Sequence, residues 1–384
     1  MLCFKPALTV ILTLAACSKA KSIGELFSST PELRNFTSIA SMYPDFVTTL
    51  SGASNITVLA PNNKAVFNNM KIMPAGTRNN AEHIKSLLAY HVLNGTYRVG
   101  DFGNEPELLP TLLTAKKSAN ITAGEPQVVK ASLMDDHVAV YSGLNKVSMV
   151  SRANINFAGG IVHIIDSVLA LPVNVSMTAI DSNLTAFVGA LASANLADTV
   201  NKLSGVTIFA PSNAAFQAIG NLVGGLSNEQ LASILSYHVV LSRAFSMDFT
   251  NSQRLRTAQG GQITIRIDDG NMYANGAKVI GADIITNNGV IHVVNGVLNP
   301  NATNDEPDTG ASTQAPAFPS ATGSSNVPFT SGVPAPTGSG MAASFPSDTP
   351  TGTGRQPNVA ASITSNVIIA AAGASLTFAA GMMV

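Results

Sequence analysis

The chain carries three sequence segments twice, in the same order. With each second copy after the first, they are NITVLAPNNKAVF (55–67) and GVTIFAPSNAAF (205–216), YHVL (90–93) and YHVV (237–240), and GGIVHIIDSVLALP (159–172) and NGVIHVVNGVLNP (288–300). A period of more than a hundred residues exceeds that of solenoid repeats. Because each copy is long enough to bury its own core, we expect two tandem domains, residues 21–172 and 173–300.

Each copy mixes helical and strand patterns. In the second copy, apolar residues recur at helical spacing over 181–203 and again from residue 228, where the helix leads into a strand near 237–241. Further strands are expected from short apolar or alternating runs, at 206–210, 262–267, 271–274 and 290–298. Helices come first and strands cluster late, which indicates an α+β fold. The first copy is longer, and its surplus at 101–127 is expected to be a surface loop.

The amino end has the features of a secretory signal peptide. The segment 1–20 has a positive charge at Lys5, followed by an apolar run that ends at Ala16. Small residues near the end of the segment fit the cleavage rule, and the run is too short to span a bilayer. The alternative is a bacterial lipoprotein box, Leu14 to Cys17, which would leave Cys17 lipidated.

The carboxyl end has the order of a signal for a glycosylphosphatidylinositol (GPI) anchor. Residues 367–384 are uncharged and mostly apolar, and a polar spacer with small residues precedes them. We therefore expect residues 359–384 to be removed and the glycolipid to be joined at Asn358 or Gly354. The alternative is a plain tail anchor that stays in the membrane.

Residues 301–358 have the composition of a stalk. They are rich in Pro, Ser, Thr and Gly, with few large apolar residues beyond Phe318, Phe329 and Phe345. Such a segment buries too little surface to offset the entropy of ordering, and Ser or Thr with Pro is typical of O-glycosylated stalks. The sequence predicts a disordered, extended stalk; the alternative is a processing linker.

Cysteines and glycosylation sequons agree with an extracellular location. Both cysteines, Cys3 and Cys17, lie in the signal segment, so the mature chain should hold no disulfide. Asn-x-Ser/Thr sequons are expected glycan sites in a secreted eukaryotic protein. They stand at Asn35, Asn55, Asn94, Asn120, Asn174, Asn183 and Asn301. Asn55 abuts a predicted strand and is the sequon with the most hindered position. Together these features favour a eukaryotic protein over the bacterial lipoprotein.

Composition and motifs argue against several functions. The net charge is −1 and only 11% of residues are charged, so no basic patch points to nucleic acid. No nucleophile elbow, zinc-protease motif or phosphate-binding loop occurs. The paired acids at 135–136 and 268–269 are expected in solvated turns. We therefore expect a protein that is not an enzyme and needs no cofactor, with a secreted enzyme as a weaker alternative.

Each histidine precedes Val or Ile, which favours positions in apolar strands or at helix edges. A metal site built from His91, His163 and Asp166 is the sharper hypothesis; a buried imidazole with backbone or hydroxyl partners is favoured over it. Asn63 and Asn213 are expected to bond the backbone at strand-to-helix turns rather than a ligand. The tyrosines that precede two of the histidines are expected to bury their rings with the hydroxyl bonded, and an adhesive role is the alternative.

The repeated segments resemble those of the fasciclin-like (FAS1) domain family. That family has a Thr-Val-Phe-Ala-Pro-Thr-Asn-x-Ala-Phe box, a Tyr-His pair and a Gly-Val-Ile-His-x-Ile-Asp box, in this order. The resemblance covers roughly residues 21–300. Val66 stands where the first box has Phe, and Asn295 where the last box has Asp. The second departure removes a charge that the first copy keeps at Asp166, so the two copies need not bind alike.

The resemblance implies two tandem FAS1 domains, each a wedge of β-strands flanked by helices. It also implies an extracellular, non-catalytic role in cell–cell or cell–matrix adhesion. In animal members, the region around the Tyr-His pair is linked to integrin binding, which makes residues 87–93 and 234–241 candidate adhesive segments. The residues carried over as an adhesive or structural motif are Tyr90, His91, His163, Asp166, Tyr237, His238 and His292.

We therefore expect an adhesion protein held by a GPI anchor on the outer face of the plasma membrane or in the cell wall. Its expected partners are proteins and glycans of cell surfaces or matrix, the membrane through the lipid, and further copies of the chain in homophilic contacts. No metal and no nucleic acid are expected. The alternative is a cell-wall structural or glycan-binding protein whose domains crosslink polysaccharide.

Overall fold

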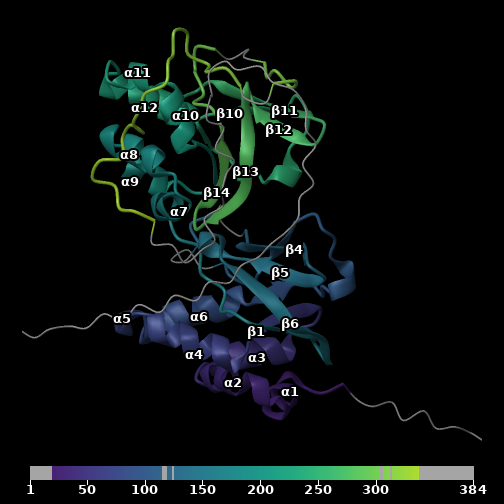
Figure 1. The fold of residues 1–384 in the computed structure, drawn as a ribbon. Coiled ribbons are helices and arrows are strands. Elements are labelled where there is room, and N and C mark those ends of the chain that lie inside the picture. Colours follow the sequence, from purple (N-terminus) through teal and green to yellow (C-terminus); the bar gives the residue numbers. More distant parts are fainter. Residues whose placement is uncertain (1–19, 115–118, 123–124, 303–305, 312–313, 337–384) are drawn as a thin grey trace, which may run out of the picture. The chain divides into compact units, whose positions relative to one another are not determined.

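The computed structural model describes residues 20–114, 119–122, 125–302, 306–311 and 314–336. Within this part of the chain, each repeated unit contains a seven-stranded mixed sheet with helices packed against it (Figure 1). The α+β class and the duplication into two similar units are therefore confirmed. No helix within the described ranges is long and apolar enough to cross a membrane. The predicted signal segment up to residue 19, the anchor signal and both candidate attachment residues lie outside these ranges.

The first domain begins with three α-helices and a short 3-10 helix, and most of its strands come late in the order. Its elements are α1 (Ile23–Ser29), η1 (Pro31–Leu33), α2 (Arg34–Ser41), α3 (Pro44–Gly52), β1 (Ile56–Pro61), α4 (Asn63–Ile72), α5 (Ala75–Arg78), α6 (Ala81–Tyr90), β2 (Val92–Asn94), η2 (Val99–Asp101), β3 (Glu107–Pro110), β4 (Val128–Met134), β5 (His137–Tyr141), η3 (Gly143–Asn145), β6 (Val147–Phe157) and β7 (Gly160–Ile165).

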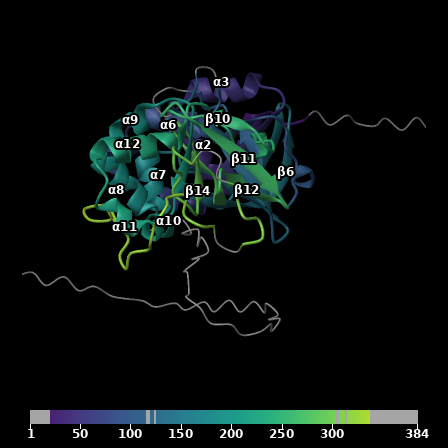
Figure 2. The same cartoon turned by 90° about the horizontal axis from the view of Figure 1, so that it is seen from above.

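The second domain repeats this order. Its elements are α7 (Val175–Asp181), α8 (Thr185–Ser193), α9 (Ala197–Lys202), β8 (Val206–Pro211), α10 (Asn213–Ala218), α11 (Gly220–Val223), α12 (Asn228–Tyr237), β9 (Val239–Val240), η4 (Ser246–Asp248), β10 (Arg254–Arg256), β11 (Gln262–Asp268), β12 (Asn271–Ala274), β13 (Ala277–Thr286) and β14 (Gly289–Val294). In the view from above, its helices gather on one side and β10, β11 and β12 on the other (Figure 2).

The two sheets have the same topology. The strand orders are β2-β1-β7-β6-β5-β4-β3 and β10-β11-β12-β13-β14-β8-β9. In each sheet one pair is parallel, β1 with β7 and β8 with β14, and the other pairs are antiparallel. Isolated bridges, Leu93 to Thr111 and Val240 to Thr257, nearly close each sheet on itself. The first and third repeated segments therefore lie side by side in space, although about a hundred residues separate them in the first copy.

Glycine is required where the last strand of each domain begins. A Cβ built on Gly160 would lie 1.9 Å from the carbonyl oxygen of Ile56 on the neighbouring parallel strand. A Cβ on Gly289 would lie 1.9 Å from the carbonyl oxygen of Val206. No side chain fits in that space, so the glycine that opens the third repeated segment is a packing requirement of the parallel pair.

Alternation along the central strands gives each domain two cores. Ile56, Val58 and Ala60 of β1 pack against the helices, whereas Leu59 faces the core inside the curved sheet. Successive strand side chains point to opposite faces, so one strand serves both cores. The second domain repeats this division, with Phe209 of β8 in the core inside the sheet.

The helix predicted over 181–203 is interrupted, so that prediction is wrong in part. Helix α7 ends at Asp181, and α8 and α9 follow as separate helices. Asn183 and Asn195 occupy the breaks with positive φ angles of 58° and 55°. Asparagine tolerates this left-handed conformation better than most residues, which lets the chain turn between short helices while its apolar residues stay in one core.

The surface loop predicted at 101–127 is also wrong in part. Strand β3 and its neighbour Thr111 come from this segment and help to close the first sheet. At its end, Gln127 is buried and its Nε2 donates a hydrogen bond to the carbonyl oxygen of Thr286 in the second domain, at 2.9 Å. Glu125 forms an ion pair with Arg243 at 2.9 Å. The segment therefore contributes to the sheet and to the contact between domains.

The first half of the predicted stalk packs on the second domain, so the prediction of disorder is wrong there. Residues 317–333, which we call the strap, follow the helices of this domain as the yellow trace in Figure 1. Phe318 and Phe329, with Ala321, Val327 and Val333, pack against the helical core. These few apolar side chains supply the burial that the average composition of the segment conceals. Residues 337–358 lie outside the described ranges.

Candidate functional site

The histidine of each Tyr-His pair joins the end of a helix to the segment after the last strand. His91 and His238 follow the last residues of α6 and α12. The Nδ1 atom of His91 lies 2.7 Å from the carbonyl oxygen of Leu87, and its Nε2 lies 3.1 Å from the backbone nitrogen of Leu169. His238 makes the matching pair of contacts at 2.8 and 2.9 Å. A neutral ring with its proton on Nδ1 satisfies both partners.

Both rings are fully buried, and burial decides their charge. Desolvation lowers the pKa of His91 to about 4 and that of His238 to about 4, because a charged ring would lose its hydration. The hydrogen bond to the helix carbonyl opposes this shift and is the smaller effect. These histidines are therefore neutral crosslinks at physiological pH.

The second histidine of each domain is used in the same manner. His163 Nε2 lies 2.8 Å from the carbonyl oxygen of Tyr97, and its Nδ1 accepts from the backbone N–H of Asn154 at 3.2 Å. His292 repeats this with Ala244 at 3.0 Å and Asp283 at 3.4 Å. Burial lowers the pKa of both rings. With both nitrogens engaged, these rings crosslink β7 or β14 to neighbouring backbone.

The two tyrosines are buried with bonded hydroxyls, as predicted. Tyr90 donates to the carbonyl oxygen of Val128 at 2.9 Å. Tyr237 donates to the carbonyl oxygen of Gln262 at 2.6 Å and accepts from Asn275 Nδ2 at 3.0 Å. Burial raises the pKa of both phenols. Neither side chain is exposed to a partner, so an adhesive role for these hydroxyls would need the domain to open.

The departure at Asn295 leaves the local geometry unchanged. In the first domain, Asp166 Oδ1 accepts from the backbone N–H of Met149 at 2.8 Å. In the second, Asn295 Oδ1 accepts from the backbone N–H of Lys278, also at 2.8 Å. Both residues therefore tie the end of the last strand to the strand beside it, and the interaction needs an oxygen acceptor rather than a charge.

The asparagines after the first strands are also structural. Asn63 Oδ1 accepts from the backbone N–H of Asn35, and its Nδ2 donates to the carbonyl oxygen of Pro31. Asn213 makes the matching contacts with Ala186 and Thr185. Each amide thus fixes the start of one helix against another.

The metal hypothesis finds no matching geometry. His91 and His163 donate and accept within separate sets of backbone contacts, and Asp166 is exposed and bonded to Met149. Within the described ranges no group of three or more His, Cys, Asp or Glu side chains could hold an ion. His137 is the first residue of the apolar strand β5, as predicted, but its side chain is exposed.

The sequons differ in accessibility. The side chains of Asn55, Asn94, Asn183 and Asn301 are exposed, so the expected hindrance at Asn55 is wrong. Asn120 is the contrasting case. Its Nδ2 donates to the carbonyl oxygens of Lys202 and Leu203, at 3.0 and 3.1 Å. Because both amide protons are engaged with the second domain, a glycan on this nitrogen would replace part of the contact.

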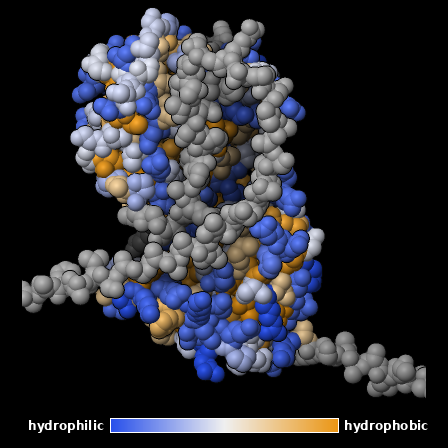
Figure 3. All heavy atoms as spheres, in the orientation of Figure 1, coloured by the Kyte–Doolittle hydropathy of each residue, from blue (hydrophilic) through white to orange (hydrophobic). Residues whose placement is uncertain are grey.

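Exposed apolar side chains on α4 form a surface that the sequence did not single out. Phe67, Met70 and Ile72 are 55%, 45% and 74% exposed. We call these three residues the α4 surface. At the same positions of the repeat, 150 residues later, the second domain has Gln217, Gly220 and Leu222. The sequence feature that could have revealed the α4 surface is this difference between two otherwise similar copies. Figure 3 shows hydrophobic residues in small groups among hydrophilic ones on the face in view.

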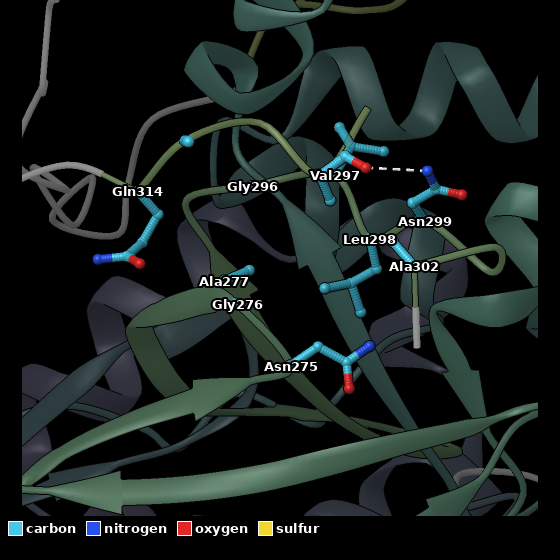
Figure 4. A pocket seen from close by; sticks show the side chains of 11 residues that line it. Asn275, Gly276, Ala277, Gly296, Val297, Leu298, Asn299, Ala302 and Gln314 are labelled. Atoms are coloured by element: carbon cyan, nitrogen blue, oxygen red, sulfur yellow. Dashed lines mark hydrogen bonds between the residues drawn. The ribbon is translucent and has the colours of Figure 1, made fainter. Parts of the chain in front are cut away.

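A small pocket lies beside the Asn275-Gly276 turn of the second domain (Figure 4). It is lined by the Asn275-Gly276 turn, the end of the third repeated segment, residues 314 and 315 before the strap, and Ala317 at the start of the strap. Beside the pocket, Asn299 Nδ2 donates a hydrogen bond to the carbonyl oxygen of Ala317 at 2.9 Å. The pocket has room for little more than one water molecule, so it does not resemble a ligand site.

The fold and these sites define a class of protein: two tandem α+β domains whose repeated polar residues hold the fold together and leave recognition to the surface. The chain belongs to the fasciclin domain family. The model of the Fasciclin domain matches residues 31–172 and 182–300.

Fungal proteins are among the relatives. The chain is 33% identical over 328 residues to a fasciclin-like arabinogalactan protein of Arthroderma benhamiae, covering 84% of this chain and 77% of that protein. It is 32% identical to the fasciclin-like arabinogalactan protein elcF of Phaeosphaeria nodorum, covering 75% of this chain and 91% of that protein. These relatives span both domains, which supports one tandem architecture.

A solved structure with some likeness is the FAS1 domain pair from the insect cell adhesion molecule Fasciclin I. It is 19% identical, with a TM-score of 0.35, and the match covers 70% of this chain and 97% of that one.

Proposed function

We propose that this protein is a surface adhesion protein, held outside the plasma membrane or in the cell wall by a GPI anchor, and that it has no catalytic role. Adhesion is supported by membership of the fasciclin family, whose resemblance implies an adhesive role. The absence of enzyme motifs from the sequence and the structural use of the buried histidines agree with it. Many weak contacts between two surfaces would act together.

The α4 surface carries this proposal. Its three side chains are large and apolar yet exposed, and Lys71 lies over the ring of Phe67 at 4.4 Å. Flexible methionine beside an aromatic ring suits contact with protein. We therefore assign it to a protein on the opposing surface, and glycan contact to the alternative function.

The proposed anchor and glycans would hold the α4 surface outside the cell. The apolar run at 367–384 and the small residues before it support a lipid attached at Asn358 or Gly354. The exposed sequons Asn55, Asn94 and Asn183 support a glycosylated, extracellular chain.

Adhesion is tested with cells that display the full chain. Phe67→Gln together with Met70→Gly gives the first domain the residues of the second at those positions, and we expect cell–cell or cell–matrix adhesion to fall several-fold with unchanged surface amount. Met247→Gln, at an exposed methionine of η4, is the matched control and should adhere normally. Unchanged adhesion of the double variant would remove the α4 surface from the proposal.

Anchoring is tested separately. Phosphatidylinositol-specific phospholipase should release the protein from cells, and Asn358→Gln combined with Gly354→Gln should abolish surface display. Retention of the protein after complete lipase cleavage of a GPI-anchored reference would contradict the anchor. The alternative function, a wall protein that crosslinks polysaccharide, predicts instead that the full chain binds wall glycans on an array and that its loss leaves adhesion intact but the wall fragile.

A further inference from the structure

The second domain has a groove that fits the strap closely. We call the residues beneath it the strap groove: Gly189, Phe216, Gln217, Gly220 and Asn221. A Cβ built on Gly189 would lie 1.7 Å from the carbonyl oxygen of Phe329, and one on Gly220 would lie 2.1 Å from Ser324 Oγ. The strap therefore passes where only glycine leaves room.

Asn221 forms hydrogen bonds with the backbone of the strap. Its Nδ2 donates to the carbonyl oxygen of Ser320 at 3.1 Å, and its Oδ1 accepts from the backbone N–H of Thr322 at 2.8 Å. Its own backbone N–H donates to the carbonyl oxygen of Thr322 at 3.3 Å. Three bonds from one residue fix two strap positions, as in recognition of an extended peptide.

Further contacts come from neighbouring residues of the groove. Gln217 Nε2 donates to the carbonyl oxygen of Ser324, and its backbone oxygen accepts from the Ser324 N–H, both at 3.0 Å. The ring of Phe329 meets Phe216 edge-on with centroids 5.9 Å apart. Phe318 lines a surface hollow with Ile219 and other residues near α11. The groove therefore holds the strap through polar contacts to its backbone and apolar contacts to its phenylalanines.

The first domain lacks this groove. The repeat offset places Met70 at the position of Gly220 and Lys71 at that of Asn221. Asn63 fixes the start of α2 at Asn35, and Asn213 fixes the start of α8 at Ala186, so these two helices correspond in the repeat. In that register Ser38 stands at the position of Gly189. Within the described ranges the chain therefore has one groove of this kind.

The sequence contains a second segment like the one that the groove holds. Residues 318–322 read FPSAT, and residues 345–349 read FPSDT. We propose that residues 345–349, outside the described ranges, are an alternative occupant of the strap groove of the same chain. The backbone N–H groups used at Thr322 and Ser324 recur at Thr349 and Thr351, neither of which is proline.

The first segment is the default occupant. Asp348 replaces Ala321, which packs against the core, and Gln356 stands where Phe329 would recur. The longer loop that the exchange requires would oppose it only weakly. The loop from Pro300 to the seated phenylalanine would lengthen from 18 to 45 residues, which lowers the probability of closure by only about fourfold.

Exchange would change the reach of the domains. With the strap seated, 25 residues separate Val333 from Asn358; with the second segment seated through Thr351, 7 residues remain. At about 3.1 Å per residue the tether would shorten from about 80 to about 20 Å. This consequence rests on the proposed anchor, whereas the occupancy of the groove does not.

The test follows amide exchange at Asn221, whose N–H donates to the strap, in the full mature chain without lipid. Phe318→Ala with Phe329→Ala removes both apolar anchors of the strap, and we expect the Asn221 amide to stay protected because the second segment takes the groove. Adding Phe345→Ala should speed its exchange by about tenfold. A synthetic peptide of residues 343–351 should restore protection in the triple variant.

Two outcomes would overturn the proposal. One is equal exchange at Asn221 in the double and triple variants, with no effect of the peptide. The other is protection that falls on dilution, since that would assign the ligand to a second copy of the chain. The Ile208 amide in β8 reports whether each variant is folded. Because the measurement uses protein without lipid, its failure leaves the anchor unaffected.

Discussion

The imidazole of His91 accepts a hydrogen bond from the backbone N–H of Leu169 at 3.1 Å, and His238 repeats the contact with Leu298 at 2.9 Å. Each ring spans from a helix end to the segment that follows the last strand. The Tyr-His pair, taken from the sequence as a candidate adhesive motif, is thus a crosslink in the interior of each domain. Variants of it should be judged by stability before adhesion.

Stability should fall as the pH is lowered from about 6.5 to about 4. The folded pKa values of His91 and His238 are lowered to about 4, so between these pH values the unfolded chain binds more protons. The stabilising contribution is full above the unfolded pKa and is lost as the pH falls through that window. It amounts to about 3 kcal/mol per histidine.

Urea unfolding between pH 7.5 and 4 measures this effect. His91→Gln should flatten the curve, whereas His137→Gln, at an exposed histidine, serves as the control and should leave the slope unchanged. A free energy of unfolding that does not vary over this range would contradict the neutral crosslinks.

Gly160→Ala should destabilise the first domain by about 3 kcal/mol, because the new Cβ meets the carbonyl oxygen of Ile56 at 1.9 Å. Gly289→Ala should do the same in the second domain. Gly24→Ala, where nothing lies within 4 Å, is the matched control and should be neutral or stabilising by about 0.5–1 kcal/mol. Thermal unfolding of the three variants measures these differences. Similar melting temperatures would show that the parallel strands can move apart to admit the new Cβ.

Asp166→Asn should change the free energy of unfolding by less than about 0.5 kcal/mol, since Asn295 makes the matching bond at the same distance. Asp166→Ala should cost about 1–2 kcal/mol because the N–H of Met149 loses its acceptor. Denaturant titration of both variants compares them. If Asp166→Asn were as damaging as Asp166→Ala, the carboxylate charge would have a role that the geometry does not contain.

Glycan occupancy should follow accessibility. We expect sugars at Asn55, Asn94 and Asn183, which are exposed, and none at Asn120, whose amide protons bond to the second domain. Enzymatic deglycosylation in ¹⁸O-labelled water, followed by peptide mass spectrometry, reads each site. Full occupancy of Asn120 in secreted protein would show that the contact between domains forms differently.

Much of the fold could be predicted because its signals are local or repeated. Strands β11 and β12 lie where the short alternating runs predicted them. The helix over 181–203 was predicted as one element because its apolar spacing continues across Asn195, whose left-handed backbone only the structure shows.

The charge and the role of the histidines could not be predicted in the same way. The sequence could not say which backbone groups would meet His163, because Asn154 reaches the ring from the neighbouring strand β6 across a bulged register and Tyr97 is 66 residues away. A metal site and a buried crosslink therefore remained alternatives until those contacts were known.

The sequence by itself determined that the chain is a tandem pair, since a duplicated order of segments needs no knowledge of contacts. Only the tertiary structure decided the roles of Gly160 and the histidines and the path of the strap. Composition averages over a segment, but burial depends on a few side chains such as Phe318 and Phe329 and on what lies opposite them. Glycines at 189 and 220 leave room for that backbone, and their meaning appears only when residues more than a hundred positions apart come into contact.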